Sequence, residues 1–351
     1  MPPLVFVVPG SIETRTGGYI YDRRMIEGLR GLGWMVDVRE LDATFPFPTR
    51  ESLDHAAGVL AGICNGAVVV IDGLALGAMP DLIEREASRL RIVALVHLPL
   101  AAHVGIDSDT AARLEVAERR ALGAAALIVV TGTATLPMLT TYRLPPDHVV
   151  VVEPGTDRAP LATGSGGTPL QLLSVATISP GKGHEILVQA LAEAPHRNWR
   201  LTCAGNATRY PATVDRLRSV VRSLDLQDLV VIAGELDATT LAGYYMQTDL
   251  FVLATLQETY GMAVAEALAH GLPVVSTATG AIPDLVGDAA GLLVPPGNTA
   301  ALTEALSRAL GDRELRARCA EGARSARDRL PSWEHACERM DAALTHFDAH
   351  G

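Results

Sequence analysis

Twelve short runs rich in Val, Ile and Leu recur along this chain, and helical patterns separate them. Six lie in the first half, at 4–8, 35–41, 67–72, 91–97, 126–132 and 148–153, and six in the second, at 170–177, 199–205, 229–235, 250–255, 273–277 and 290–294. They lack the polar alternation of a sheet with one face in water, which indicates parallel strands covered by helices on both faces. The sequence therefore predicts an α/β protein with two doubly wound, Rossmann-like domains.

A segment rich in Gly and Pro, residues 155–169, separates the two sets of strands and is the predicted linker. We expect a first domain over residues 1–157 and a second over 158–330, and 351 residues suffice for a core in each. Residues 331–351 are predicted to form one more amphipathic helix, which crosses back to the first domain. Its apolar residues share one helical face: Trp333, Ala336, Met340 and Leu344.

Charge and composition exclude several classes of protein. The formal net charge of −11 is unsuited to binding nucleic acid or anionic membranes. The four cysteines show no metal-ligand spacing, which favours reduced thiols in a cytoplasmic protein. The longest apolar stretch, 59–80, is broken by Asn65 and Asp72, so we predict no transmembrane segment.

Lysine occurs once in this chain, at position 182, among 29 Lys and Arg residues. It lies in SPGKGHEIL, between the predicted strand at 170–177 and a helix, so its ammonium should lie near the carboxyl edge of the second sheet. A compact charge on a flexible side chain suits a phosphate oxygen. A solvated surface lysine is the alternative interpretation.

The segment QETYGMAVAEALAHGLPVV, residues 257–275, follows another buried strand. We expect a helix to open at Thr259 and Tyr260, with Glu258 before it and Glu266 inside it. The unpaired N–H groups near Gly261 would then form an anion site at the edge of the sheet. An ordinary helix whose acidic first turn suits the helix dipole is the alternative.

Together these segments resemble the retaining, nucleotide-sugar-dependent glycosyltransferases of the GT-B architecture, specifically family 4, the glycosyl transferases group 1. The resemblance is strongest over residues 172–298 and weaker in the first half. The motif P-x-K-G is met by Pro180, Lys182 and Gly183. The motif E-x-(F/Y)-G-x-x-x-x-E-A is met by Glu258, Tyr260, Gly261, Glu266 and Ala267. The later motifs G-x-P-V-V and G-L-L-V-x-P-x-(D/N) are met at 271–275 and 291–298.

The resemblance also implies roles for single residues. The implied catalytic residues are Lys182, Glu258 and His97, with Lys182 on the donor diphosphate and His97 facing the transferred sugar. The implied donor-binding residues are Gly17, Gly18, Lys182, Glu235, Leu236, Glu258, Gly261, Met262, Ala263 and Glu266. No metal and no cofactor are expected. From its local sequence alone, His97 could equally cap the strand that it ends.

The activity implied by the resemblance is transfer of a hexose-type sugar from a nucleoside diphosphate sugar to an acceptor hydroxyl, with retained anomeric configuration, in polysaccharide or glycoconjugate biosynthesis. A UDP-sugar is the favoured donor and a GDP-sugar the alternative. The expected acceptor is a small molecule, an oligosaccharide or a lipid-linked sugar. Two other functions remain open, a sugar-nucleotide 2-epimerase and a catalytically silent nucleotide-binding protein. A dehydrogenase is disfavoured because no G-x-G-x-x-G follows the first strand.

The chain departs from the family pattern at one position that matters. The family commonly has an arginine, a second phosphate cation, where this sequence has Thr177. Either the N–H groups at the helix start and Lys182 suffice, or an arginine such as Arg15 or Arg23 of the first glycine-rich segment replaces it, and we hold the second idea as a hypothesis.

Overall fold

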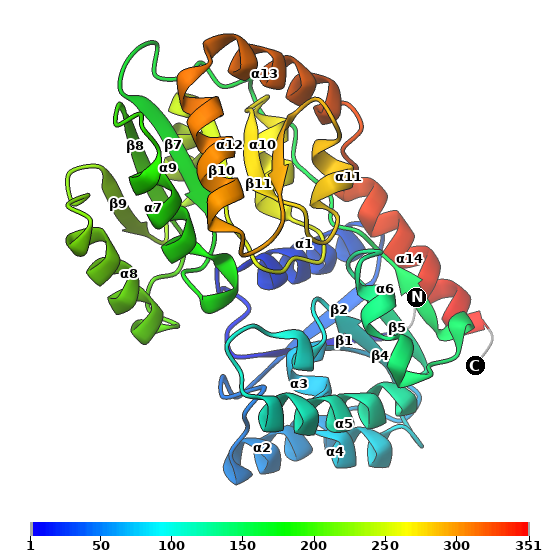
Figure 1. Ribbon diagram of the computed structural model, residues 1–351. Coiled ribbons are helices and arrows are strands. Elements are labelled where there is room, and N and C mark those ends of the chain that lie inside the picture. The colour runs from blue at the N-terminus through cyan, green and yellow to red at the C-terminus, as the bar shows by residue number, and fades with distance from the viewer. Residues whose placement is uncertain (1–2, 350–351) are drawn as a thin grey trace. The chain divides into compact units, whose positions relative to one another are not determined.

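The computed structural model describes residues 3–349, with side chains up to residue 346. The chain divides into two compact units, Met1–Gly155 with Trp333–Gly351, and Thr156–Ser332. Each unit holds one six-stranded sheet with helices on both faces (Figure 1). The predicted α/β architecture is confirmed, and each of the twelve apolar runs contains one strand.

The first unit contains a parallel sheet in the order β2-β1-β3-β4-β5-β6. Its strands are β1 (Pro3–Pro9), β2 (Met35–Leu41), β3 (Val68–Asp72), β4 (Arg91–Val96), β5 (Leu127–Val130) and β6 (Val149–Val151). Its α-helices are α1 (Gly17–Gly31), α2 (Arg50–Ala61), α3 (Gly73–Leu76), α4 (Pro80–Glu86), α5 (Ser108–Ala124), α6 (Thr135–Met138) and α14 (Trp333–Ala349). Three short 3-10 helices complete it: η1 (Leu100–Ala102), η2 (Thr140–Tyr142) and η3 (Pro146–His148).

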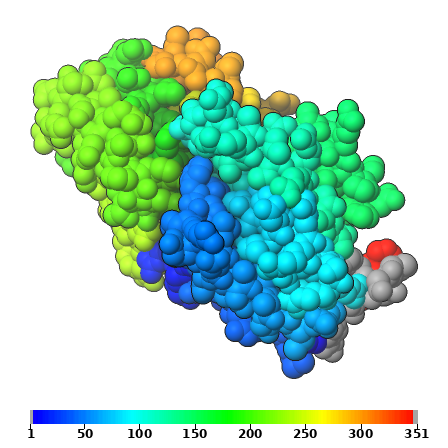
Figure 2. All heavy atoms as spheres, turned by 90° about the horizontal axis from the view of Figure 1, so that it is seen from below, coloured from blue at the N-terminus to red at the C-terminus, as the bar shows by residue number. Residues whose placement is uncertain are grey.

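Helices α2 to α5 pack on one face of this sheet and share its core. Their outer surfaces form part of the face that Figure 2 shows, in blue to teal. Helix α14 contacts α1, and the Trp34 indole N–H donates to Asp341 Oδ1 at 2.7 Å. The apolar residues predicted to share one face of the last helix are all buried: Trp333, Ala336, Met340 and Leu344. The amphipathic pattern read from the sequence is therefore the packing face of α14.

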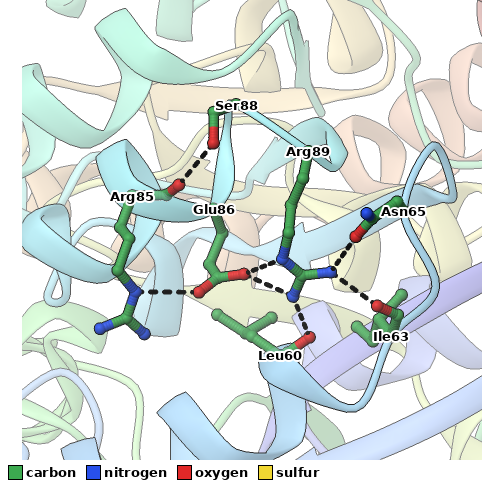
Figure 3. A network of polar contacts seen from close by, with 7 residues as sticks. All are labelled: Leu60, Ile63, Asn65, Arg85, Glu86, Ser88 and Arg89. Atoms are coloured by element: carbon green, nitrogen blue, oxygen red, sulfur yellow. Dashed lines mark hydrogen bonds and ion pairs between the residues drawn. The ribbon is translucent and has the colours of Figure 1, made fainter.

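An arginine network fastens α2 to α4 at the amino end of the first sheet (Figure 3). Arg89 donates to the carbonyl oxygens of Leu60 at 2.7 Å and Ile63 at 2.6 Å, and to the buried carboxylate of Glu86 at 2.7 Å. Helix ends leave carbonyl groups without partners, and the guanidinium satisfies those at the end of α2. Because parallel strands present binding sites at their carboxyl ends, we interpret this network as structural.

The second unit contains a parallel sheet in the order β12-β11-β10-β7-β8-β9. Its strands are β7 (Leu170–Val175), β8 (Trp199–Ala204), β9 (Val230–Gly234), β10 (Leu250–Leu253), β11 (Val274–Thr277) and β12 (Gly291–Val294). Its helices are η4 (Pro180–Lys182), α7 (His184–Glu193), α8 (Pro211–Ser223), α9 (Ala238–Gln247), α10 (Met262–Ala269), α11 (Ile282–Val286), α12 (Thr299–Gly311) and α13 (Arg313–Arg327). One core joins the sheet to α7, α8 and α12, and the other joins it to α9, α10, α11 and α13.

One predicted boundary is wrong. Helix α10 begins at Met262 and not at Thr259 or Tyr260, because Gly261 has a left-handed φ of 102° and is the N-cap. A residue with this φ cannot continue a right-handed helix backwards.

Two expectations from composition can be compared with the structure. The four cysteines are free, and three of them are buried, as predicted for thiols. Across the described part of the chain, no helix combines the length and the apolar character that a membrane span requires.

Candidate functional site

Lys182 lies at the carboxyl edge of the second sheet, in the loop between β7 and α7. Its ammonium forms an ion pair with Glu258 Oε1, and the two side chains are 28% and 14% exposed. The lysine is thus held against the loop that follows β10 and does not extend freely into solvent. The structure brings together two of the predicted site residues, which lie 76 positions apart in the sequence.

Backbone packing explains why these two loops meet. Gly183 has a left-handed φ of 64°, and a Cβ there would overlap the carbonyl oxygen of Ala254 just beyond β10. The N–H of Leu256 donates to the carbonyl of Gly181 at 2.7 Å. A glycine is therefore required next to the lysine, and it lets the β7 loop lie directly on the end of the neighbouring strand.

The start of α10 lies where the sequence predicts an anion site. No side chain among the described residues caps the helix at Gly261, and the half-buried Met262 and Ala263 form its first turn. Gly280 also has a left-handed φ, 58°, and a Cβ there would overlap the backbone of Glu258. Unpaired N–H groups at a helix start carry partial positive charge, so this end of α10 suits a phosphate.

Glu266 lies one turn further along α10 and is oriented by an aromatic side chain. The hydroxyl of Tyr245 donates to Glu266 Oε2 at 2.9 Å. Tyr245 is itself buried and stacked on His270, with ring centroids 4.7 Å apart. This hydrogen bond orients the half-buried carboxylate of Glu266.

Glu235 and Leu236 lie just past β9, at the same edge of the second sheet. Glu235 is exposed and accepts a hydrogen bond from the Asn206 amide at 2.7 Å, while Leu236 is half-buried against the core. Asn206 also accepts from the backbone N–H groups of Thr208 and Arg209. No motif in the sequence pointed to Asn206, whose side chain joins the loops after β8 and β9.

His97, which follows β4, belongs to the first unit. A Cβ on Gly18 would lie 3.2 Å from His97 Cδ2, so this glycine lets α1 approach the imidazole closely. Gly17 is the exposed first residue of α1. The structure therefore brings together, within one unit, two residues that the resemblance implied for the site: Gly18 and His97.

Two buried carboxylates that the sequence analysis missed lie against His97. Its Nε2 is 2.9 Å from Asp22 Oδ1 and 3.6 Å from Asp72 Oδ2. Both carboxyl groups are buried, whereas the His97 side chain is 21% exposed. Asp22 follows the glycine-rich segment by a few positions and Asp72 ends β3, but only the folded sheet places them beside the histidine.

Burial and these two acids perturb the titration of the cluster. Burial and then the Asp22 charge raise the pKa of Asp72 to about 7. Burial lowers the pKa of His97, but Asp22 and Asp72 outweigh it, and the pKa lies above its ordinary value. Among residues 3–346, these three side chains are a group whose ligand atoms all lie within 4.8 Å of one another, so they are the candidate holders of a metal ion.

The first-unit arginines proposed to replace the missing cation differ in their contacts. The Arg23 guanidinium donates to the carbonyl oxygens of Ile12 and Thr14, the latter at 2.9 Å, and so holds its own loop. Arg15 is exposed. Arg15 is therefore the better candidate for the second phosphate cation, because Arg23 is bound to its own loop.

The second unit is similar in sequence to known proteins. Residues 157–326 match the family model described as glycosyl transferases group 1. The D-inositol 3-phosphate glycosyltransferase of Kineococcus radiotolerans is 33% identical over 231 residues, which cover 57% of this chain and 52% of that protein. That of Frankia alni is 31% identical over 256 residues, 63% of this chain and 61% of that protein. The chain spans about half the length of the curated relatives it matches.

Solved structures share the fold over the whole chain. Sucrose-phosphate synthase from Thermosynechococcus elongatus has a TM-score of 0.84 at 21% identity and covers 100% of both chains. Anabaena HepE in complex with UDP-glucose has a TM-score of 0.76 at 17% identity and covers 98% of this chain and 99% of that one. At these identities the likeness concerns the fold, which is the GT-B fold of these neighbours. Over residues 157–326 of its second unit, this chain is similar to the glycosyl transferases group 1 family.

Proposed function

We propose that this chain is a hexosyltransferase that moves a sugar from a nucleoside diphosphate to an acceptor hydroxyl, with retention of anomeric configuration and without a metal ion. The observation that carries the proposal is Lys182, held beside Glu258 and in the same unit as the uncapped start of α10. The match of residues 157–326 to the glycosyl transferases group 1 family model supports the same reaction class.

The chemistry of the leaving group explains the arrangement. Cleavage of the sugar–phosphate bond develops negative charge on the departing diphosphate and positive charge on the anomeric carbon. A positioned ammonium and aligned backbone N–H groups stabilise that transition state more than the ground state. We assign the diphosphate to Lys182 and to the first turn of α10 at Gly261, Met262 and Ala263.

Glu258 then has a different role before and after the donor binds. Without donor, its carboxylate neutralises Lys182. A bound diphosphate competes for the ammonium, and the released carboxylate accepts hydrogen bonds from the sugar hydroxyls. Glu258 is therefore assigned as a positioning residue and not as a nucleophile.

Other second-unit residues would hold the nucleoside. We assign the ribose hydroxyls to Glu266, whose carboxylate Tyr245 orients, and the base to the segment at Glu235 and Leu236. A UDP-sugar is the proposed donor, which is consistent with the neighbouring Anabaena HepE having been solved with UDP and with UDP-glucose.

In the first unit, we assign His97 to the transferred sugar and Gly17 and Gly18 to close approach by the phosphates. Nε2 of the His97 imidazole already contacts Oδ1 of Asp22 at 2.9 Å. For that reason we propose that Asp22, Asp72 and His97 exchange protons and do not hold a metal ion. Turnover should therefore persist in EDTA. A small hydroxylated, oligosaccharide or lipid-linked molecule is the proposed acceptor.

The decisive assay follows nucleotide release and the sugar product in the same reaction. The wild-type protein, incubated with UDP-glucose or GDP-mannose and a panel of acceptors, should release nucleoside diphosphate and form a product whose anomeric proton shows retained configuration. Lys182→Ala should lower turnover by about 100-fold, since loss of one such donor costs about 3 kcal/mol. Lys182→Arg, the matched control, keeps the charge and should retain part of the activity. An epimerised nucleotide sugar without transfer would contradict the proposal.

A further inference from the structure

A cavity of about 220 Å³ lies in the second unit where the start of α7 faces α8. Figure 1 shows these two helices beside one another on the same side of the sheet. The cavity is lined by the loop before α7, the first turn of α7 and two residues of α8: Thr213 and Arg216. Lys182 is not among the lining residues and contacts Glu258 instead. The cavity therefore lies next to the loop of Lys182 but does not include that residue of the proposed diphosphate site.

His184 is the residue of this cavity whose buried ring nitrogens indicate a ligand. It is the first residue of α7, lines the cavity and is only 2% exposed. Within the described part of the chain, neither of its ring nitrogens has a hydrogen-bond partner. Leaving a buried polar group without a partner costs about 1–3 kcal/mol, and native structures rarely do so.

The protonation state of His184 defines what it can bind. Burial, with a smaller contribution from the Lys182 ammonium, lowers the pKa of His184 to about 4. At neutral pH the ring therefore offers one N–H donor and one acceptor nitrogen. A ligand group that satisfies it must supply an acceptor and a donor.

The surroundings of the imidazole favour an anion. Residues 183–186 all line the cavity, and no described side chain caps the start of α7, a helix of 10 residues. The N–H groups of this first turn carry the positive end of the helix dipole. The guanidinium of Arg216 contacts Glu185 Oε1 and Thr213 Oγ1, each at 3.2 Å, and keeps further N–H donors. Glu185 is thereby neutralised.

We propose that this cavity binds one phosphate group, held by the start of α7, His184 and Arg216. A volume of about 220 Å³ lies below the roughly 300–1,000 Å³ of pockets that enclose drug-sized ligands, so a single small group fits it. Monohydrogen phosphate and a phosphate monoester both supply acceptor oxygens. The hydroxyl group of monohydrogen phosphate, or of a protonated monoester, also supplies the donor that the imidazole requires. The site does not depend on the proposed glycosyltransferase activity.

Binding of two probes tests the site and identifies the source of the phosphate. Inorganic phosphate and glucose 6-phosphate are titrated separately into the full-length protein by calorimetry. Arg216→Gln should weaken binding at least tenfold. Arg218→Gln is the matched control, because this arginine lies on the same helix and its side chain is equally exposed, 54% in both cases. It should bind as the wild type does. Tighter binding of inorganic phosphate supports a free-phosphate site, and tighter binding of glucose 6-phosphate supports a site for phosphate esters.

Two further measurements separate this site from the diphosphate site. Lys182→Ala should retain phosphate binding in the cavity, whereas its effect on nucleotide binding tests the proposed function. The NMR signals of the His184 ring, assigned by their loss in His184→Gln, should show a raised pKa when phosphate is present. Any of three results would overturn the proposal. They are wild-type phosphate affinity in Arg216→Gln, loss of all phosphate binding in Lys182→Ala, and a His184 pKa that does not change when phosphate is added. The Arg216 and Lys182 variants keep the test valid even if His184→Gln fails to fold.

Discussion

Glu118 offers a stability test that can be worked out from the structure. This residue of α5 is 1% exposed, and its carboxylate accepts hydrogen bonds from the N–H of Leu100, at 3.1 and 3.0 Å, and from the hydroxyl of Tyr142, at 2.8 Å. It thereby fastens the loop that follows His97 to α5. Burial raises the pKa of Glu118 from its ordinary value of 4.5 to about 7, although both hydrogen bonds act in the opposite direction.

The sign and size of the effect follow from this shift. Between the two pKa values the folded protein binds more protons than the unfolded chain, so the Glu118 contribution to stability falls as the pH rises through that window. Each pKa unit corresponds to about 1.36 kcal/mol, so the contribution declines by roughly 3 kcal/mol between about pH 4 and pH 8. Glu118→Gln has no such titration. Near pH 4 it should be slightly less stable than the wild type, because its amide replaces the carboxyl group in the Tyr142 contact.

The assay is urea denaturation followed by tryptophan fluorescence, at several pH values from 4 to 8. The free energy of unfolding of Glu118→Gln should rise relative to the wild type by roughly 3 kcal/mol across this range. Glu115→Gln is the matched control, since Glu115 lies on the same helix and is only half-buried. It should show a much smaller change. A difference between Glu118→Gln and wild type that stays constant within about 1 kcal/mol would refute the reasoning.

Three other substitutions test the packing of the candidate site. Gly183→Ala should destabilise the second unit by several kcal/mol, because its Cβ would overlap the carbonyl of Ala254. The measurement is the midpoint of urea denaturation, and an unchanged midpoint would contradict this prediction. Tyr245→Phe should weaken nucleoside diphosphate binding several-fold without unfolding the protein, because Glu266 loses its orienting hydroxyl, and calorimetry measures the change. The pKa of Asp72 is about 7, so its contribution to the free energy of unfolding falls as the pH rises from about 4 to 7. Asp72→Asn should abolish this fall, and a pH dependence equal to that of the wild type would contradict the assignment.

The sequence was most informative where burial leaves a local pattern. A strand covered on both faces must be apolar along its whole length, so the twelve Val, Ile and Leu runs could be assigned without tertiary information. The same holds for α14, whose buried face repeats with helical spacing. The start of α10 was predicted too early because Gly261 adopts a left-handed φ of 102°, which the residue type permits but does not require.

The candidate site could be predicted only in part. The edge location of Lys182 and Glu258 followed from their places after strands, but their ion pair depends on two loops 76 positions apart meeting in the fold. Asp22 lies 75 positions from His97 and carried no local signal of its role. His184 looked like an ordinary first residue of a helix, and only its burial without a hydrogen-bond partner distinguishes it.

Nucleotide binding by the second unit is the central claim, and thermal stability measures it directly. The unfolding midpoint is recorded with UDP, GDP and ADP, each with and without EDTA, for the wild type and Lys182→Ala. Binding to the folded state raises the midpoint by mass action. We predict a rise with UDP that persists in EDTA and shrinks in Lys182→Ala. An unchanged midpoint with all three nucleotides, or an equal rise in the variant, would contradict the assignment of Lys182 to the diphosphate.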